Sequence, residues 1–398
     1  MKPQPTIPAH QPETSRVILG VKQIEVVNQK SLEKWDVVYP ALRLVAENIL
    51  VTSNERILLY GCHQGALPTY LVTSYPQTTL TIIDHNYTAI ETTRQTLAAN
   101  SILLTSVDFM TNLELPAECN SKFEIVIMML PKSRSLARRW LIQASHALAP
   151  SGRLYIAGSN AEGIQSVLKD ASELFGQGSI LAYKKGNRIA QFIMKDPAAT
   201  VPDWALTPGI APGTWVEFSV EAANQVLQIR SLPGIFAYDH LDEGTYTLLQ
   251  AMEIPHAARV LDAGCGYGII GMTASLLGAG RVDLIDNNLL AIAAAQETIR
   301  VNHLKNVEAF PGDLINSTSL GQYDLVISNP PFHSGHSVDY LVAEAIIRHA
   351  FMALERGGRV VIVANRFIRY DRLIEDIFGS CSTLRKSNKF HVLSGLKL

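Results

Sequence analysis

The stretch Asp324-Leu325-Val326-Ile327-Ser328-Asn329-Pro330-Pro331-Phe332-His333 organises the C-terminal half of this 398-residue chain. Its first half is a short aliphatic and β-branched run, which predicts a parallel strand, Tyr323–Ser328, that is covered on both faces. The two prolines that follow fix φ at about −65° and remove two backbone donors, and Pro330 keeps Asn329 out of the α region. We therefore expect a buried strand that ends in a stiff turn, with the Asn329 amide and the Pro330 carbonyl directed outward.

Such a turn suits the binding of an NH₂ group attached to an aromatic ring or a carbonyl. This kind of amine is a poor nucleophile, so acceptors on its two N–H bonds would hold it in an orientation for attack. The candidate acceptors are the Asn329 side-chain oxygen and the Pro330 carbonyl, and the Phe332 ring could stack on a base, worth about 1–3 kcal/mol. An isolated Asn-Pro-Pro would be interpreted as a surface turn; the strand before it and a glycine loop upstream favour a functional interpretation.

That glycine loop is Asp262-Ala263-Gly264-Cys265-Gly266-Tyr267-Gly268, between a predicted strand and a predicted helix, Ile269–Leu277. Glycines there let the backbone approach a ligand at a helix N-terminus. Asp286 ends the next predicted strand, where a carboxylate would hold ribose hydroxyls, and Asp313 follows the third, where it could accept from an adenine amine. Asp262 favours a cationic cofactor, because a pyrophosphate would be repelled there. The alternative is a plain strand-to-helix turn, and nicotinamide enzymes share the pattern.

One unit occurs twice in the chain, because five separated segments align in order and spacing. Each copy alternates apolar strands with helical segments, which is typical of an α/β fold with a mostly parallel sheet. Each copy also ends in a predicted hairpin that closes the sheet as an antiparallel edge. The aligned pairs are 56–65 with 259–268, 81–86 with 283–288, 97–100 with 299–302, 123–131 with 323–331, and 151–156 with 357–362.

The predicted domains are residues 17–195 and 215–398, joined by a Pro- and Gly-rich linker, 196–214. Residues 1–16 are expected to form a disordered tail, because the first fourteen contain four prolines and no apolar segment. The strands predicted in the second copy are Arg259–Asp262, Arg281–Asp286, Val307–Phe310, Tyr323–Ser328 and Gly358–Ala364, and its helices include Leu289–Val301 and Tyr340–Leu354. The predicted hairpins are Ser179–Lys185 with Arg188–Met194, Trp215–Val220 with Val226–Arg230, and Ser382–Arg385 with Phe390–Leu393.

Composition narrows the class of protein. Hydrophobic residues make up 47% of the chain and charged residues 18%, without an apolar run of membrane-spanning length. The four cysteines lie far apart without a Cys-x-x-Cys, which argues against zinc and against a disulfide framework. A net charge of −2 means that any nucleic-acid contact must come from a local patch. We expect a cytoplasmic monomer that binds neither metal nor membrane.

On these motifs the chain resembles class I S-adenosylmethionine-dependent methyltransferases that act on an exocyclic amino group. With Gly234-Ile235-Phe236, Leu241-Asp242-x-Gly244 and Ile362-Val363-Ala364-Asn365-Arg366-Phe367, it further resembles the bacterial ribosomal RNA guanine-N2 methyltransferases of the small- and large-subunit type. These carry two tandem Rossmann-like domains, of which only the second is active. The resemblance covers the chain after Val17, with Ala237 where Ser is frequent. It implies methyl transfer from S-adenosylmethionine to the N2 amine of a guanine, in ribosomal RNA or a ribosomal subunit.

The resemblance also implies the site residues. Asn329, Pro330 and Phe332 would hold the target guanine and form the catalytic set, with Phe236 and His333 as further substrate contacts. We interpret His333 as positioning rather than a general base, because a methylated arylamine cation loses its proton to water. The expected cofactor-binding residues are Asp262, Gly264, Gly266, Asp286, Asn287, Asp313 and Asn329.

The first copy lacks the same residues. Leu59 replaces the loop acid, His63 replaces a glycine, and Met129 and Leu130 replace the Asn and the first Pro. We predict an inactive copy that positions RNA or supports its neighbour. Lys132 and Arg134 are the predicted substrate-binding residues of this copy, although a solvated charged face is the alternative for each cation. The cations considered are Lys132, Arg134, Arg138 and Arg139 after its fourth strand, and Lys184, Lys185 and Arg188 on its hairpin.

Other functions remain open at this stage. The same turn could grip adenine N6 or a protein glutamine amide, since each is a planar amine or amide. A non-catalytic RNA-binding or assembly protein is a further alternative, against which the intact motifs of the second copy argue. A nicotinamide oxidoreductase is the weakest, because Asn-Pro-Pro-Phe has no role in hydride transfer. Phe378-Gly379 and Asn388-Lys389-Phe390 slightly favour the large-subunit type.

Overall fold

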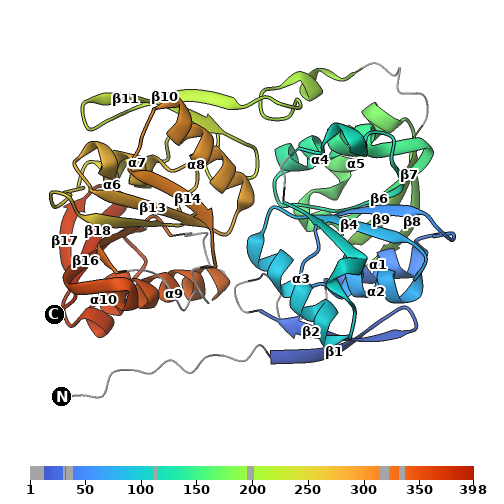
Figure 1. The fold of residues 1–398 in the computed structure, drawn as a ribbon, viewed down its shortest axis with the longest axis horizontal. Coiled ribbons are helices and arrows are strands. Elements are labelled where there is room, and N and C mark those ends of the chain that lie inside the picture. The colour runs from blue at the N-terminus through green and yellow to red at the C-terminus, as the bar shows by residue number, and fades with distance from the viewer. Residues whose placement is uncertain are drawn as a thin grey trace. The chain divides into compact units, whose positions relative to one another are not determined.

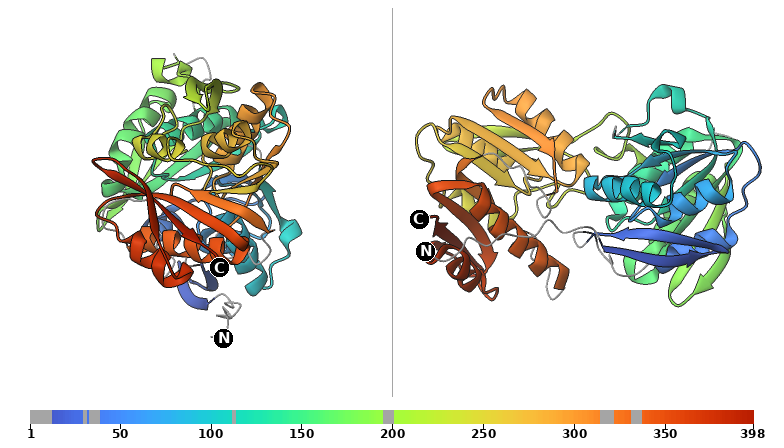
Figure 2. Two further views of the ribbon diagram at one scale, coloured as in Figure 1. Left: turned by 90° about the vertical axis from the view of Figure 1, so that its left-hand side faces the viewer. Right: turned by 60° about the horizontal axis from the view of Figure 1, so that its bottom comes forward.

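A computed structural model of the chain shows two seven-stranded sheets, each flanked by helices (Figures 1 and 2). It describes residues 13–29, 32, 39–111, 114–194, 201–313, 322–330 and 337–398, without the side chains of 337–341. The chain divides into two compact units. Unit 1 comprises Met1–Asp84 and Thr88–Ala205, and unit 2 comprises Leu206–Leu398 together with His85–Tyr87.

Unit 1 begins with a two-stranded hairpin and a helix, and its sheet and remaining helices follow. Four short 3₁₀ segments interrupt its loops. The elements are β1 (Glu13–Leu19), β2 (Lys22–Asn28), α1 (Pro40–Asn48), β3 (Arg56–Tyr60), α2 (Ala66–Ser74), β4 (Thr79–Ile83), α3 (Tyr87–Ala99), β5 (Val107–Met110), β6 (Phe123–Met129), α4 (Arg134–Ala147), β7 (Leu148–Ser159), α5 (Ile164–Phe175), β8 (Ser179–Lys184) and β9 (Asn187–Ile193).

Unit 2 repeats this order of elements: a hairpin, a helix and then the sheet with its helices. The elements are β10 (Val216–Ala222), β11 (Gln225–Ser231), α6 (Glu243–Leu249), β12 (Arg259–Ala263), α7 (Ile269–Leu276), β13 (Arg281–Asp286), α8 (Leu289–Val301), β14 (Val307–Pro311), β15 (Tyr323–Ser328), α9 (Ser337–Ala353), β16 (Leu354–Asn365), α10 (Tyr370–Phe378), β17 (Ser382–Lys386) and β18 (Phe390–Leu396).

The two sheets have the same topology. Their strand orders are β5-β4-β3-β6-β7-β9-β8 and β14-β13-β12-β15-β16-β18-β17. The first five strands of each sheet are parallel, and the last two pair antiparallel as an edge hairpin. This confirms the predicted fold class of two tandem Rossmann-like α/β domains.

The central strands are buried on both faces, as their continuous apolar sequences predict. In β15, Leu325, Val326 and Ile327 are at most 1% exposed. Val326 belongs to a cluster in which α9 and α10 cover one face of the unit 2 sheet. Val282 and Leu284 of β13 lie against Gly271 of α7 on the other.

Several predicted boundaries agree with the structure, one prediction is corrected, and one element was not predicted. Arg281–Asp286, Leu289–Val301 and Tyr323–Ser328 are reproduced as β13, α8 and β15. The tail predicted to be disordered through residue 16 is wrong for its last four residues, because β1 starts at Glu13 and pairs with β2. The hairpin β1–β2 was not predicted, although its two strands are neighbours in the sequence and Gly20 lies in the turn between them. The division between the units falls inside the predicted linker, after Ala205.

Both units attach their first hairpin in the same way to the residue that follows a helix, α3 in unit 1 and α8 in unit 2. In unit 1, the Asn100 amide accepts from the Glu25 N–H at 3.0 Å and donates to the Glu25 carbonyl at 2.6 Å. In unit 2, Asn302 makes the same pair of bonds to Gln228, at 2.9 and 2.7 Å. An asparagine side chain thus substitutes for a strand partner on β2 and on β11, which explains why the third aligned segment ends in Asn in both copies.

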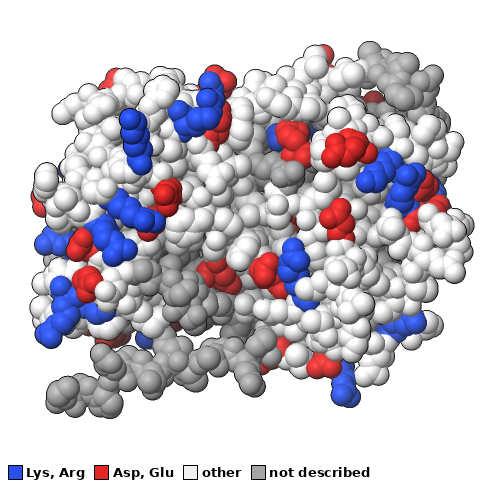
Figure 3. Space-filling model, viewed as in Figure 1, with Lys and Arg blue, Asp and Glu red and all other residues white. Residues whose placement is uncertain are grey.

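Charged side chains are mixed by sign on the face drawn in Figure 3, where Lys and Arg lie among Asp and Glu. Several cations among the described residues belong to short-range pairs, such as Arg281 with Asp283 and Glu308, and Arg300 with Glu297. Among the residues drawn in colour or white, that face shows no patch of a single sign. Positive and negative side chains are therefore interspersed on this face rather than segregated.

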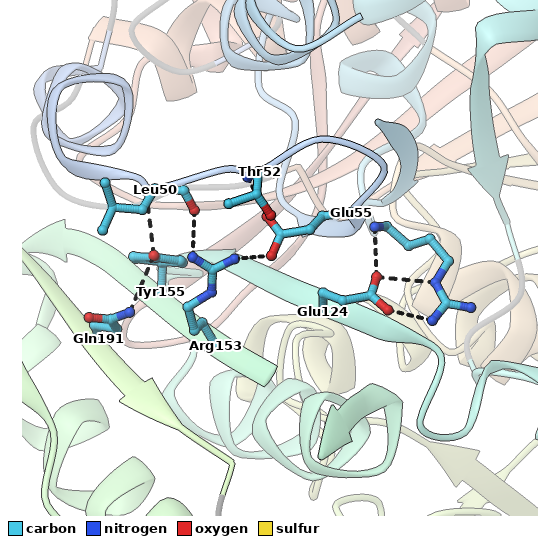
Figure 4. Close-up of polar contacts among 8 residues, drawn as sticks. Leu50, Thr52, Glu55, Glu124, Arg153, Tyr155 and Gln191 are labelled. Atoms are coloured by element: carbon cyan, nitrogen blue, oxygen red, sulfur yellow. Dashed lines mark hydrogen bonds and ion pairs between the residues drawn. The ribbon is translucent and has the colours of Figure 1, made fainter. Parts of the chain in front are cut away.

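The amino ends of the unit 1 strands are braced by polar contacts (Figure 4). Arg153 donates to the Leu50 carbonyl at 2.8 Å and pairs with Glu55, while Arg56 pairs with Glu124. Unit 2 has the shorter equivalent, in which the Arg259 N–H donates to Asp324 at 2.8 Å. These braces lie at the edge opposite the carboxyl ends of the strands, so they stabilise each sheet without occupying the edge where ligands bind in such folds.

Candidate active site

The predicted site residues of unit 2 converge at the carboxyl edge of its sheet. Strand β12 lies between β13 and β15, and the three are parallel. The segments after Ala263, Asp286 and Ser328 therefore leave the sheet side by side. The strands that follow β12 in the chain are added first on one side of it, as β13 and β14, and then on the other side, as β15 and β16. Ligands bind at such a reversal of strand order.

The glycine loop turns sharply from β12 into α7. Gly268 has φ of 90°, in the left-handed region, at the N-cap position directly before α7. Gly271 allows α7 to lie close on the sheet, since a Cβ there would be 2.1 Å from Leu284 Cδ2. This close approach lets the Gly271 N–H donate to Asp262 Oδ2 at 2.8 Å, so the helix start holds the loop acid in place.

Asp262 is a buried carboxylate with one unused oxygen. It is fully buried, and its Oδ1 has no hydrogen-bond partner among the described residues. Burial, together with the charge of Asp286, raises the pKa of Asp262 to about 7, although the Gly271 N–H opposes this. A cation placed beside Oδ1 would favour the ionised carboxylate and supply the missing partner.

Asp286 at the end of β13 organises the same edge. Its Oδ2 accepts from the Gly266 N–H at 2.9 Å and its Oδ1 from the Asn288 N–H at 2.9 Å. Desolvation raises the pKa of Asp286, while the N–H groups of Asn288, Gly266 and Asn287 lower it in part. The carboxylate is thereby oriented by the glycine loop on one side and by the start of α8 on the other.

These residues fit the cofactor that the sequence predicts. A Cβ built on Gly264 would meet no described atom within 4 Å, so there is room beside the loop backbone. Asp262 offers a buried carboxylate oxygen for a cationic group, and Asp286 offers carboxylate oxygens for hydroxyls. Asp313, two residues beyond β14, follows the next strand of the same parallel set. A ligand with a positive charge and a ribose matches this donor and acceptor set.

Asn329 is the side chain at the end of β15. Its Nδ2 donates to Thr245 Oγ1 at 2.7 Å and to Asp242 Oδ2 at 3.3 Å. Its Oδ1 is buried without a hydrogen-bond partner in the part of the chain that the structure describes. Ser328, one residue earlier, donates to the Ala263 carbonyl at 2.6 Å, which ties the end of β15 to the glycine loop. Asn329 Oδ1 is therefore available as the acceptor that the predicted binding of an NH₂ group requires.

A segment that precedes α6 lies over the glycine loop. Asn288 donates to the Gly234 carbonyl at 2.9 Å, and Ile235 Cγ2 lies 3.8 Å from a Cβ built on Gly266. The Tyr267 hydroxyl of the loop donates to the His240 carbonyl at 3.1 Å. Phe236, in this same segment, is 54% exposed, so its ring is accessible at this edge.

The predicted residues of unit 2 thus fall into two groups, those that lie at this edge and those outside the described residues. Pro330 is buried directly after Asn329, and the cofactor-binding set lies around the same edge. Phe332 and His333, with Pro331 before them, lie outside the described residues, so their roles stay predictions. The residues that sequence reasoning did not single out are Thr245, Asn288 and Tyr267. Asn288 carried a detectable signal, because an Asn before an apolar helical run predicts an N-cap, and its Oδ1 accepts from the Leu290 N–H.

The carboxyl edge of unit 1 is filled by its own side chains. Gly61, the counterpart of Gly264, has Met129 Cβ at 3.1 Å from the position of a built Cβ. Met129 and Leu130 are buried where Asn329 and Pro330 stand in unit 2. His63 adopts φ of 51° and packs beside the Tyr39 ring, with centroids 5.3 Å apart.

The cation cluster predicted after β6 is mostly engaged within unit 1. Arg134 and Arg138 both pair with Asp170, at 2.7 and 3.0 Å. Arg139 is 3% exposed and pairs with Glu114, so its interpretation as a phosphate contact is wrong. The helical spacing that puts Arg134 and Arg138 on one face directs them onto α5, which the sequence alone does not place. Lys132 is exposed and, with Arg134, stays a predicted substrate contact.

The described residues lack two features, a membrane-spanning helix and a cluster of metal ligands. No helix among them is long and apolar enough to cross a membrane. They also contain no group of three or more His, Cys, Asp or Glu side chains arranged to hold a metal ion.

Together, the strand order, the glycine loop and the two carboxylates define a tandem methyltransferase fold in which unit 2 carries the candidate ligand-binding residues. The chain belongs to the methyltransferase small domain family, which matches residues 23–191 and again 226–394. The duplicated match corresponds to the two units.

Several named proteins are similar to this chain. The ribosomal RNA small subunit methyltransferase C of Aliivibrio fischeri (strain MJ11) is 31% identical, over 69% of this chain and 78% of its own length. The protein of the same name from Chromohalobacter salexigens is 35% identical, over 68% of this chain and 78% of its own. The one from Psychromonas ingrahamii is 29% identical over 88% of this chain and 95% of its own.

Among solved structures, a T. thermophilus 16S rRNA N2 methyltransferase in complex with AdoMet and guanosine aligns with a TM-score of 0.79. The alignment covers 97% of this chain and 98% of that chain, at 23% identity. At this level of identity the likeness shows that the two proteins share the tandem fold over their whole lengths.

Proposed function

We propose that this protein transfers a methyl group from S-adenosylmethionine to the exocyclic N2 amine of a guanine in ribosomal RNA. The buried, unused Oδ1 of Asn329, at the end of β15 and beside the glycine loop, is the observation that carries the proposal. The family supports methyl transfer, and the relatives' name supports ribosomal RNA of the small subunit. That name favours the small subunit over the large one, against the slight preference drawn from the C-terminal sequence. The cytoplasm, where such RNA is found in bacteria, is the proposed location.

The cofactor would be held by the carboxylates of unit 2. Asp286 would bind the ribose hydroxyls, Asp313 the adenine amine, and Asp262 the cationic end of the molecule. When bound, S-adenosylmethionine supplies a methyl group on a positively charged sulfur. Gly264 and Gly266 leave room for it along the loop backbone.

The chain's own contribution to turnover is orientation of the amine. Asn329 Oδ1 would accept one N–H of the guanine N2 group, and the Pro330 carbonyl would accept the other. Phe332 is proposed to stack on the base, and Phe236 to contact it from the segment before α6. The base must leave its stack to reach this edge, as in other enzymes that modify nucleobases. The proton released from the amine passes to water.

The proposal is tested by replacing Asn329 with Ala. We expect Asn329→Ala to lower the rate of methylation of small-subunit RNA or particles by at least about a hundredfold, because the amine loses its orientation. Cofactor affinity, measured by calorimetry, should stay close to wild type. Met129→Leu, a volume-conserving change at the equivalent position of unit 1, is the matched control and should leave the rate unchanged.

Mass spectrometry of nucleosides and of peptides after the reaction identifies the product. N2-methylguanosine is the expected product. N6-methyladenosine or a methylated glutamine would instead establish one of the alternative substrates. Full turnover by Asn329→Ala would overturn the role given to this residue, and the absence of cofactor binding by the wild-type protein would favour a non-catalytic RNA-binding protein.

A further inference from the structure

The Asn329 amide is held by two side chains at the start of α6. Its Nδ2 donates to Thr245 Oγ1 at 2.7 Å and to Asp242 Oδ2 at 3.3 Å. The same Asp242 oxygen accepts the Thr245 N–H at 2.9 Å, which closes the three residues into one hydrogen-bonded set. The opposite end of the amide, Oδ1, is buried and has no partner within the described residues.

This arrangement decides whether the oxygen or the nitrogen of the Asn329 amide faces the candidate site. The two ends of an Asn side chain have nearly the same shape, and rotation about its last bond is broad and roughly two-fold. Packing alone therefore cannot select one orientation. Asp242 can, because an ionised carboxylate only accepts hydrogen bonds and repels the amide oxygen. The donor end must turn to Asp242 and Thr245, and the acceptor end is left at the site.

The orientation matters for the chemistry proposed above. An exocyclic NH₂ group presents N–H donors, so it needs an acceptor opposite each of them. With the amide reversed, Nδ2 would face the incoming amine and two donors would meet. Asn329 would then obstruct the amine that it is meant to orient.

We propose that Asp242 and Thr245 are positioning residues that lock the Asn329 amide with Oδ1 toward the substrate amine. They act through Asn329 and contact neither substrate nor cofactor in this role. The inference rests on the proposed function, because the amine that Asn329 grips is the one argued for above.

Glycine at position 244 supports the lock. A Cβ built there would lie 3.0 Å from Asp242 Oδ2 and 3.1 Å from Phe390 Cε1. The missing side chain thus lets the Asp242 carboxylate fold back over the first turn of α6, against β18. In this position Asp242 also caps the helix, with φ of −65° and ψ of 144°.

Three substitutions distinguish the lock on the Asn329 amide from the role of Asp242 as the N-cap of α6. Asp242→Asn keeps a good N-cap residue of the same shape but adds a donor that can face Asn329 Oδ1, so the amide can reverse. Thr245→Val removes the hydroxyl at constant shape, and Thr245→Ser restores it. The matched control is Glu243→Gln, in the same turn, whose carboxylate is exposed and pairs with Lys389 at 2.7 Å.

We expect kcat for RNA methylation to fall about tenfold or more in Asp242→Asn and Thr245→Val, with KM and the cofactor Kd within about twofold of wild type. Thr245→Ser and Glu243→Gln should stay near wild type. The lock is overturned if Asp242→Asn and Thr245→Val keep their kcat, or if Thr245→Ser loses as much as Thr245→Val. A loss that appears in the melting temperature or cofactor Kd, with kcat unchanged, would also overturn it.

A second measurement keeps the lock testable if the proposed reaction is wrong. In protein labelled with ¹⁵N at Asn, the side-chain Nδ2 protons of Asn329 should shift in Asp242→Asn and Thr245→Val but not in Glu243→Gln. Unshifted signals would overturn the lock whatever the reaction is. Shifted signals in a protein without guanine methylation would support the lock and remove the proposed substrate.

Discussion

The carboxyl edges of the two sheets are built on the same topology and differ in what fills them. In unit 2, no described atom lies within 4 Å of a Cβ built on Gly264. Two carboxylates and an amide lie at the same edge of the sheet. In unit 1, the Met129 side chain occupies the equivalent space beside Gly61, and Leu59 stands in place of Asp262. Apolar side chains have converted a ligand-binding edge into an extension of the core.

The difference shows that a fold can lose a site while keeping its framework. Asp84 of unit 1 still directly follows its strand, but the residue is 7% exposed and its carboxylate accepts the Cys62 N–H at 2.8 Å. The acid that would bind ribose in unit 2 thus serves as a loop brace in unit 1. Retention of one motif residue is therefore a weak sign of function unless its neighbours are retained as well.

The comparison of the two units is tested most strongly by removing the equivalent acids, Asp286 in unit 2 and Asp84 in unit 1. We expect Asp286→Ala to weaken cofactor binding at least about a hundredfold, because each charge-assisted hydrogen bond contributes about 1.5–3 kcal/mol. Asp84→Ala should leave cofactor affinity unchanged. Calorimetry of the two variants, after thermal unfolding has shown that both are folded, makes the measurement. Equal losses would mean that unit 1 also binds the cofactor.

The buried acid of unit 2 should make stability depend on pH. Because the pKa of Asp262 is raised to about 7, the folded state holds this proton more tightly than the unfolded state, whose value is about 3.9. Stability without cofactor should therefore fall as pH rises from about 4 to about 7, by on the order of 4 kcal/mol. Urea unfolding across this range should show a smaller fall in Asp262→Asn than in wild type. The part that remains in the variant is expected from Asp286, whose pKa is also raised.

The same titration predicts the pH dependence of binding. A cationic ligand favours the ionised carboxylate, so cofactor affinity should rise as pH rises through about 7. In unit 1, Leu59 carries no charge, and no matching dependence is expected from it. An affinity that is flat between pH 6 and 8 would exclude Asp262 as the partner of the cationic group.

A smaller effect tests what the units share. Asn100→Ala and Asn302→Ala each remove a pair of bonds that fixes the first hairpin to its unit, so each should cost about 1–2 kcal/mol of stability. The two losses should be similar, because the geometry is the same. Denaturant unfolding measures both, and hydrogen exchange in β2 and β11 locates the loosened strand. A large loss of stability in only one of the two variants would show that these hydrogen bonds do not fix the first hairpin equally in the two units.

The smallest expected effect concerns RNA positioning by unit 1, a role that is predicted from the sequence. Lys184 and Lys185 are exposed at the end of β8, whereas Arg385 and Lys389 near the equivalent hairpin of unit 2 contact Gln250 and Glu243. We expect Lys184→Ala with Lys185→Ala to weaken RNA binding severalfold and to reduce the salt slope by about 0.7–0.9 per charge. Arg385→Ala is the comparison variant and should change RNA affinity less.

Much of this protein was already encoded in local sequence. The apolar runs of β13 and β15, the helix Leu289–Val301 and the repeat were readable because hydrophobic periodicity and tandem alignment depend on neighbours in the chain. The glycine loop and the acid after β13 were readable for the same reason, since strand, turn and helix follow one another directly. The chemical type of the candidate site followed from these motifs.

Contacts between distant segments required the tertiary structure. The set formed by Asn329, Asp242 and Thr245 joins residues more than 80 positions apart, and its geometry selects the amide orientation. Met129 lies beside Gly61 and closes the edge of unit 1, and Asp170 pairs with Arg134 and Arg138 through the packing of α4 and α5. Side-chain orientation and pairing depend on which elements pack together, and that is fixed only when the whole sheet and its helices have assembled.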